Sequence, residues 1–193
     1  MRALPNIAVL APADPVETRL ATQALLECPG PSYLRLGKAG EPAIHENTPS
    51  FLPGKPIEVA DGRDVLVVST GTMLGVALKV RSLAESNGLH VAVWSCPWLK
   101  PVDEPAITEA GTRFSLIVSL EEGQSTGGLG GTLAEILAAL PGPHARLLRL
   151  GVPDMILTES YSQESARTRI GLDATAIRKA ILNARSSDAV PKE

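Results

Sequence analysis

The sequence predicts an α/β fold in which a mostly parallel sheet is flanked by helices and preceded by a strand–helix–strand fragment. Short apolar runs of strand length alternate with helical stretches of roughly 10–15 residues, which is typical of βαβ units. Hydrophobic residues make up 44% of the 193 residues, but aromatic residues only 3%. We therefore expect a core built from Ala, Leu, Val and Ile.

Charge and composition exclude several classes of protein. The chain has 18 basic and 21 acidic side chains and a net charge of -3, so it lacks the basic surface that nucleic acids and anionic membranes attract. No apolar run approaches the roughly 18 residues that a membrane helix needs. Cys28 and Cys96 fit no metal-binding spacing and are expected to be reduced. We expect a cytoplasmic protein without nucleic-acid or membrane partners.

The first elements are predicted to be a strand, a helix and a second strand. Asn6–Leu10 is short and apolar. A helix is expected to follow Asp14, because an Asp side chain can accept from free N–H groups and Pro15 suits a first turn. Glu17 stands at the capping-box position, and a Pro-Gly-Pro turn ends the helix. Tyr33–Leu36 is the second strand.

Residues 39–62 are predicted to be a linker, because Gly and Pro are dense there and hydrophobic periodicity is lost. The apolar stretch Ile57–Val59 could form one short strand within it. Regular alternation follows. The strands expected beyond the linker are Asp64–Ser69, His90–Ser95, Phe114–Leu120 and Arg146–Leu150. The helices expected there are Met73–Ser86, Asp103–Ala110, Thr132–Leu140 and Gln163–Arg185, the last broken at Gly171 and all separated by loops such as Pro97–Val102.

A glycine-rich turn, Ser125–Gly131, follows a predicted strand and opens a helix. Such a turn can bind phosphate through free backbone N–H groups. It matches neither the GxGxxG register nor GxxxxGK[ST]. Close packing of the helix on its neighbours is therefore the favoured interpretation, and a nucleotide-binding protein remains a distant alternative.

Glu121 and Glu122 end a predicted strand at the carboxyl edge of the sheet, where open α/β sheets carry their sites. Paired carboxylates could bind a cation or perform acid–base chemistry. Adjacent side chains on a strand point to opposite faces, however, which favours a solvated pair or a partner for a helix terminus. Glu122 is the better candidate for a site, because glycines follow it.

Arg35 lies between leucines in a short strand and needs a partner: a carboxylate, another subunit or an anionic ligand. Its guanidinium group also matches a phosphate dianion. The three histidines, His45, His90 and His144, are isolated and predict no metal site. The hydroxyl groups of Ser69–Thr72 are explained by helix capping.

The order and spacing of several segments together resemble the transketolase family over residues 1–184. The Leu-Arg-Leu-Gly-Lys and Ala-Pro-Ala-Asp stretches favour transketolase over deoxyxylulose phosphate synthases and the beta subunits of 2-oxoacid dehydrogenases. The segments that carry the resemblance are Ala11–Thr18, Gly30–Lys38, Asp64–Gly71, Pro101–Asp103, Leu120–Gly130 and Gly171–Ile177.

The resemblance implies a division of the chain and a role for one residue. In such enzymes thiamine diphosphate lies between two domains at a dimer interface and is held through Mg²⁺, and a carboxy-terminal domain completes the dimer. Residues 1–38 would be the end of the pyrimidine-binding domain, 63–185 the carboxy-terminal domain, and 186–193 a flexible tail. Arg35 matches an arginine that contacts the phosphate of the sugar phosphate substrate.

The chain also departs from the family pattern. It has no Gly-Asp-Gly followed by Asn, the activating glutamate belongs to a part before residue 1, and Glu121-Glu122-Gly123 stands where many relatives have Glu-Glu-His. We assign no catalytic, cofactor-binding or metal-binding residue. The chain is expected to transfer two-carbon ketol units between sugar phosphates only with an N-terminal polypeptide that binds thiamine diphosphate and Mg²⁺, as a homo- or hetero-oligomer. The alternatives are a non-catalytic dimerisation or ligand-binding module, a truncated remnant, and a part of a deoxyxylulose phosphate synthase-like enzyme.

Overall fold

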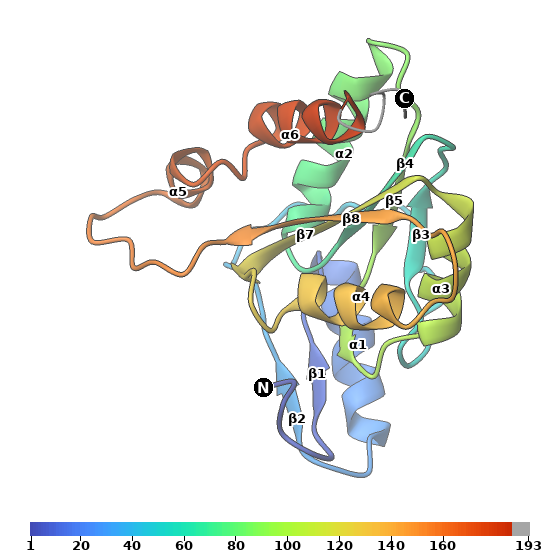
Figure 1. Cartoon of the computed structure of the whole chain (residues 1–193). Coiled ribbons are helices and arrows are strands. Elements are labelled where there is room, and N and C mark those ends of the chain that lie inside the picture. The colour runs from blue at the N-terminus through green and yellow to red at the C-terminus, as the bar shows by residue number, and fades with distance from the viewer. Residues whose placement is uncertain (187–193) are drawn as a thin grey trace.

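The chain forms two sheets flanked by helices, as seen in a computed structural model that describes residues 1–186 (Figure 1). The larger sheet has the strand order β3-β5-β4-β7-β8, and the smaller sheet has the order β2-β1-β6. The predicted α/β class is confirmed. Of the predicted tail, only Ser186 is described, as the last residue of a helix, and 187–193 lie outside the described residues.

The larger sheet is mostly parallel. Strands β4, β5, β7 and β8 run parallel, and β3 pairs with β5 in the antiparallel direction. All residues of β4 and β5 are buried, which agrees with their uninterrupted apolar sequences. The bounds of the strands are β3 Ile57–Ala60, β4 Val65–Ser69, β5 Val91–Ser95, β7 Leu116–Gln124 and β8 Arg146–Val152.

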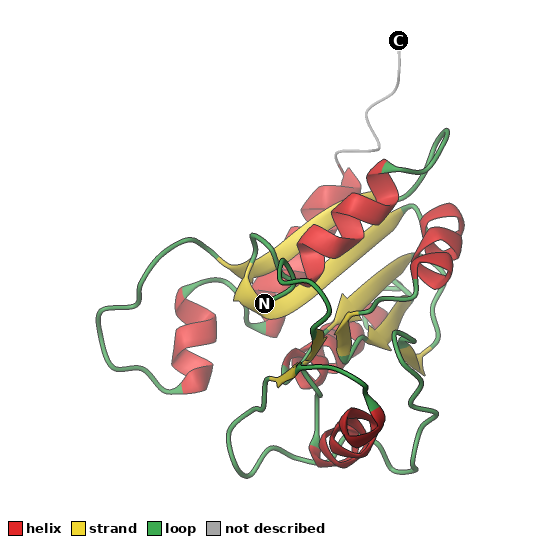
Figure 2. Cartoon of the chain, turned by 90° about the horizontal axis from the view of Figure 1, so that it is seen from below, coloured by secondary structure: helices red, strands yellow, loops and turns green. Residues whose placement is uncertain are grey.

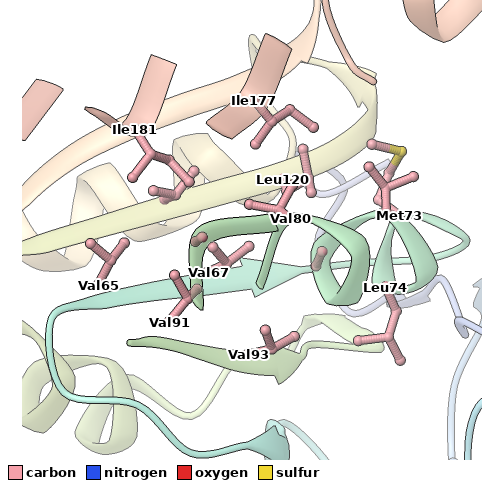
Figure 3. Close-up of a cluster of buried hydrophobic side chains, with 14 of the residues drawn as sticks. Val65, Val67, Met73, Leu74, Val80, Val91, Val93, Leu120, Ile177 and Ile181 are labelled. Carbon is pink, nitrogen blue, oxygen red and sulfur yellow. The ribbon is translucent and has the colours of Figure 1, made fainter. Parts of the chain in front are cut away.

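Helices cover both faces of this sheet (Figure 2). Alternate residues of β4 enter two separate cores, because successive side chains of a strand point to opposite faces. Val65 and Val67 pack with α2 and α6 (Figure 3), whereas Leu66 and Val68 pack with α3 and α4. The helix bounds are α2 Met73–Glu85, α3 Glu104–Arg113, α4 Leu129–Ala138, α5 Gln163–Arg169 and α6 Ala174–Ser186. The predicted interruption at Gly171 is confirmed.

The smaller sheet joins the beginning of the chain to a later segment. Strand β1 (Ala8–Leu10) pairs in parallel with β2 (Ser32–Leu34), and α1 (Pro15–Glu27) connects them. Strand β6 (Trp98–Lys100) pairs with β1 in the antiparallel direction. The prediction of a loop over 97–102 was therefore wrong, because this strand forms through hydrogen bonds to residues far away in the sequence.

The predicted linker contributes to the fold. The stretch Ile57–Val59 lies in β3, and its Ile57 pairs with Ser95 of β5. Residues 57–60 of the segment 39–62 therefore belong to the edge of the larger sheet. Helix α4 begins at Leu129, three residues before the predicted start at Thr132.

A buried polar cluster fastens the segment before β3 to the start of α1. Asp14 caps α1 as predicted, accepting from the Glu17 N–H at 2.8 Å. The other Asp14 oxygen accepts from the N–H groups of Ile44 and His45 at 2.8 and 3.0 Å. The fully buried Glu17 carboxylate contacts His45 Nε2 at 2.9 Å and accepts from the Ala13 N–H, not from the Asp14 N–H of a capping box.

The cluster shifts the pKa values of its members. The hydrogen bond to Glu17 raises the pKa of His45 and outweighs the opposing effect of burial. Burial alone would raise the pKa of Asp14, but the N–H groups of His45, Glu17 and Ile44 together hold that pKa below its ordinary value. A charged Glu17–His45 pair is therefore favoured at neutral pH.

The variant His45→Gln should show how much this pair contributes. Because the pKa of folded His45 exceeds the unfolded value near 6.5, its charge stabilises the fold below pH 6.5, and the contribution is lost as the pH rises through the folded pKa. We expect the unfolding free energy of His45→Gln to be about 1 kcal/mol below wild type at pH 6 and nearly equal at pH 9. The measurement is urea denaturation at both pH values.

Substitution of the exposed His90 by Gln is the matched control and should leave the pH dependence of wild type unchanged. A deficit of His45→Gln that is the same at pH 6 and pH 9 would contradict the charged pair.

Candidate functional site

A pocket of about 180 Å³ lies where the carboxyl ends of the strands of both sheets meet. The smaller sheet contributes the residues that follow β1 and β2, including Arg35 and Lys38. The larger sheet contributes the turn after β4 and the end of β7, including Thr72 and Glu122. Open α/β sheets bind ligands at this edge, because loops and helix N-termini converge there.

Hydrogen bonds across the pocket floor fix the two sheets to each other. The Gly71 N–H and the Thr70 hydroxyl both donate to the Ala11 carbonyl, at 3.0 and 3.3 Å. The Ala11 N–H donates to the Pro97 carbonyl at 2.8 Å. The walls of the pocket, although far apart in sequence, are therefore held together by main-chain contacts.

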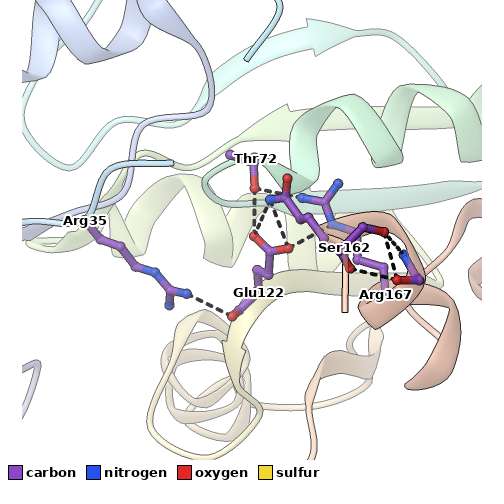
Figure 4. Close-up of polar contacts among 7 residues, drawn as sticks. Arg35, Thr72, Glu122, Ser162 and Arg167 are labelled. Atoms are coloured by element: carbon purple, nitrogen blue, oxygen red, sulfur yellow. Dashed lines mark hydrogen bonds and ion pairs between the residues drawn. The ribbon is translucent and has the colours of Figure 1, made fainter. Parts of the chain in front are cut away.

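Arg35 follows β2 and lines the pocket with an exposed side chain. Its Nη2 donates to the backbone carbonyl of Glu122 at 3.1 Å (Figure 4). No carboxylate of residues 1–186 forms an ion pair with it, so the alternative of a structural ion pair within the described chain is not observed. Its positive charge is available to a ligand or a partner subunit.

The Glu122 carboxylate is held by three side chains from two other elements (Figure 4). Arg167 Nε donates to Oε1 and the Thr72 hydroxyl donates to Oε2, both at 2.9 Å. Gln163 Nε2 lies 3.3 and 3.2 Å from the two oxygens. Arg167 Nη2 also donates to the Thr72 hydroxyl at 2.9 Å, which closes the network.

Two members of this network, Gln163 and Arg167, were missed from the sequence. Their spacing of four residues predicts one shared helix face. It carries no information about which distant carboxylate that face contacts. The interpretation of Ser69–Thr72 as capping residues was wrong for the three hydroxyl side chains. Ser69 donates to the Trp94 carbonyl, Thr70 to the Ala11 carbonyl and Thr72 to Glu122.

Glu121 points to the opposite side of β7 and binds the N-terminus of α4. Its carboxylate accepts from the N–H groups of Leu129 and Gly130 at 3.0 and 2.9 Å. Burial raises its pKa, and these two hydrogen bonds offset only part of that effect. The expectation that adjacent carboxylates diverge and that one serves a helix terminus is confirmed.

The same contact explains the glycine-rich turn. A Cβ atom on Gly128 would lie 1.8 Å from Glu121 Oε2, so a side chain at this position would displace the carboxylate. Two of the N–H groups that could bind phosphate already donate to Glu121. The interpretation as close packing is confirmed for this turn.

The remaining predicted candidates form no further site in the part of the chain that is described. No group of three or more His, Cys, Asp or Glu side chains in residues 1–186 could hold a metal ion. Cys28 and Cys96 are both free, as expected, and burial raises the pKa of the Cys96 thiol to about 12. Among the described helices, none is long and apolar enough to span a membrane.

A mostly parallel sheet with helices on both faces and a polar pocket at its carboxyl edge defines an α/β protein of the ligand-binding type. Residues 54–177 match the family model described as "Transketolase, C-terminal domain". The chain belongs to this family. The resemblance inferred from the sequence motifs is confirmed.

Two curated relatives match nearly the whole chain. One is named "Putative transketolase C-terminal section" of Methanocaldococcus jannaschii and is 32% identical over 94% of this chain and 57% of the relative. The other is a subunit of an apulose-4-phosphate transketolase of Phocaeicola vulgatus and is 31% identical over the same shares. A "1-deoxy-D-xylulose-5-phosphate synthase" of Synechococcus is 30% identical over 94% of this chain and 28% of its own. The chain thus spans little more than half of the first two relatives.

Two solved structures are similar. A structure described as "Split gene transketolase, inactive beta4 tetramer" has a TM-score of 0.83 and 31% identity over 95% of this chain and 58% of the other. Transketolase from Campylobacter jejuni has a TM-score of 0.65 at 18% identity over 94% of this chain and 27% of its own, which is a likeness of fold.

The variant Gly128→Ala should be destabilised by the clash with the buried Glu121 carboxylate. Moving that carboxylate breaks two charge-assisted hydrogen bonds, so we expect a loss of roughly 2 kcal/mol in unfolding free energy by denaturant titration. Gly131→Ala, in the same helix, is the control, because its Cβ would meet only the flexible end of Arg2.

The clash predicts non-additivity as well. In a Glu121→Ala background the carboxylate is absent, and Gly128→Ala should then cost much less than it costs in wild type. An equal cost in both backgrounds would show that the glycine is required for a different reason.

Proposed function

We propose that this chain is the C-terminal part or subunit of a thiamine diphosphate-dependent transketolase-like enzyme, which transfers two-carbon ketol units between sugar phosphates. The observation that carries the proposal is the near-complete match of this chain to relatives named as a transketolase C-terminal section and as a transketolase subunit. We place the enzyme in the cytoplasm, since both cysteine thiols are free.

The partner in this proposal is an N-terminal polypeptide that supplies the groups for thiamine diphosphate and Mg²⁺. The proposal is supported by the similar split-gene transketolase structure, whose tetramer of beta chains is described as inactive. It is also supported by β2, which pairs with β1 on one side and forms an edge of the smaller sheet. Leu26 and Tyr33 are exposed nearby on α1 and β2, with fractional exposures of 84% and 39%. An unpaired edge beside exposed apolar side chains is a surface suited to another chain.

Arg35 is proposed to bind the phosphate group of the substrate. Its guanidinium donates to a neutral carbonyl and lines the pocket together with Lys38. A phosphate dianion would complete the hydrogen bonds of the guanidinium group through charge-assisted contacts. Arg35 would thereby position the substrate and take no part in bond making or breaking.

A second candidate function, as part of a 1-deoxy-D-xylulose-5-phosphate synthase, is favoured by the relatives that carry that name. The two proposals differ in product. Formation of deoxyxylulose phosphate by the assembled complex, without ketol transfer between sugar phosphates, would assign the chain to the second. A complex with neither activity would favour a non-catalytic dimerisation or ligand-binding module.

The test of Arg35 uses the complex of this chain with its N-terminal partner. We expect Arg35→Ala to raise KM for phosphorylated sugars by roughly 10–100-fold, because one charge-assisted contact is lost, with a much smaller effect on sugars without phosphate. Arg63→Ala replaces an exposed arginine away from the pocket and serves as the control. An unchanged KM for Arg35→Ala would remove this residue from the substrate site.

Calorimetry tests where the cofactor groups lie. Titration of thiamine diphosphate with Mg²⁺ into this chain alone should give no binding heat, whereas titration into the complex should give a saturable isotherm. Micromolar binding by the chain alone would contradict the division of labour proposed between the two polypeptides.

A further inference from the structure

We propose that Arg167 is a positioning residue that keeps Arg35 available to a phosphate ligand by neutralising the Glu122 carboxylate. The inference rests on the proposed role of Arg35 and extends it to a residue of α5 that does not line the pocket. It identifies which side chains control the charge of the site.

Arg35 and Glu122 are neighbours that do not form an ion pair. Arg35 Nη2 donates to the main-chain oxygen of Glu122 at 3.1 Å, while the carboxylate of the same residue is turned toward α5 and Thr72 (Figure 4). A guanidinium group beside a carboxylate ordinarily forms a bidentate pair with it. The separation therefore has to be maintained by other groups.

Arg167 supplies the charge that maintains it. The Arg167–Glu122 contact is 2.9 Å, and the two side chains are 16% and 27% exposed. The Thr72 hydroxyl and the Gln163 amide complete the coordination of the carboxylate, but both are neutral. Among the described residues that bind this carboxylate, Arg167 is the one cation.

The opposite side of Arg35 offers no competing anion. The Glu121 carboxylate is committed to the N–H groups of Leu129 and Gly130 and is 3% exposed. Of the two acidic side chains at the end of β7, Glu122 is therefore the one that could turn toward Arg35 when its partner is removed. Such a turn would neutralise Arg35 and would also repel a phosphate dianion.

The proposal predicts that removing Arg167 weakens phosphate binding through Glu122. The experiment is an NMR titration of the full ¹⁵N-labelled chain with inorganic phosphate and with ribose 5-phosphate, followed at the Arg35 Nε–H signal. We expect Arg167→Ala to weaken binding roughly three- to tenfold, as the loss of one partly exposed charge contact implies. Arg167→Lys, which keeps the charge, should stay close to wild type.

The decisive variant is Arg167→Ala combined with Glu122→Gln. Because the glutamine has no charge to place on Arg35, the double variant should bind phosphate within about twofold of Glu122→Gln alone. Arg169→Ala removes an exposed arginine from the same helix and should leave binding unchanged. If Arg167 served only to dock α5, the double variant would bind as weakly as Arg167→Ala.

The outcomes separate the two proposals. If phosphate does not perturb the Arg35 signal, or if Arg35→Ala binds as well as wild type, both the proposed role of Arg35 and this inference fail. If binding depends on Arg35 but Arg167→Ala binds like wild type, or if the double variant shows no recovery, only the role of Arg167 is overturned.

Discussion

The end of β7 carries two adjacent carboxylates that are neutralised from opposite sides of the sheet, and the arrangement of the site depends on this constraint. Glu121 binds the first N–H groups of α4, and Glu122 binds α5 and the turn before α2. One strand therefore fixes three helices around the pocket. Because the two side chains must diverge, neither carboxylate blocks Arg35, whose guanidinium meets the main chain between them.

Much of this arrangement could be predicted from local sequence. The apolar runs of β4 and β5 indicated strands buried on both faces, and Asp14 with Pro15 placed the start of α1. The divergence of Glu121 and Glu122 followed from the geometry of an extended chain. Each of these inferences needs only residues within a few positions of one another.

The parts that could not be predicted depend on partners distant in the sequence. Strand β6 has three residues and exists because β1 lies beside it, about ninety positions earlier. Arg167 is separated from Glu122 by 45 positions, and no local pattern indicates that α5 returns to the end of β7. Arg35 was identified from its unusual place between leucines, yet its hydrogen bond to a backbone oxygen required the fold.

The pairing of β6 with β1 also affects how the chain can be divided. A boundary drawn through the segment 39–62 separates two stretches that look like independent units in the sequence. The third strand of the first sheet, however, comes from the second stretch, and Trp98 fills the core between β1 and α1. The hydrogen bonds of β6 run straight into the main chain leading to α3, so a displacement of the first sheet is transmitted mechanically to the second. The two units form one elastic body, and the pocket lies at the joint.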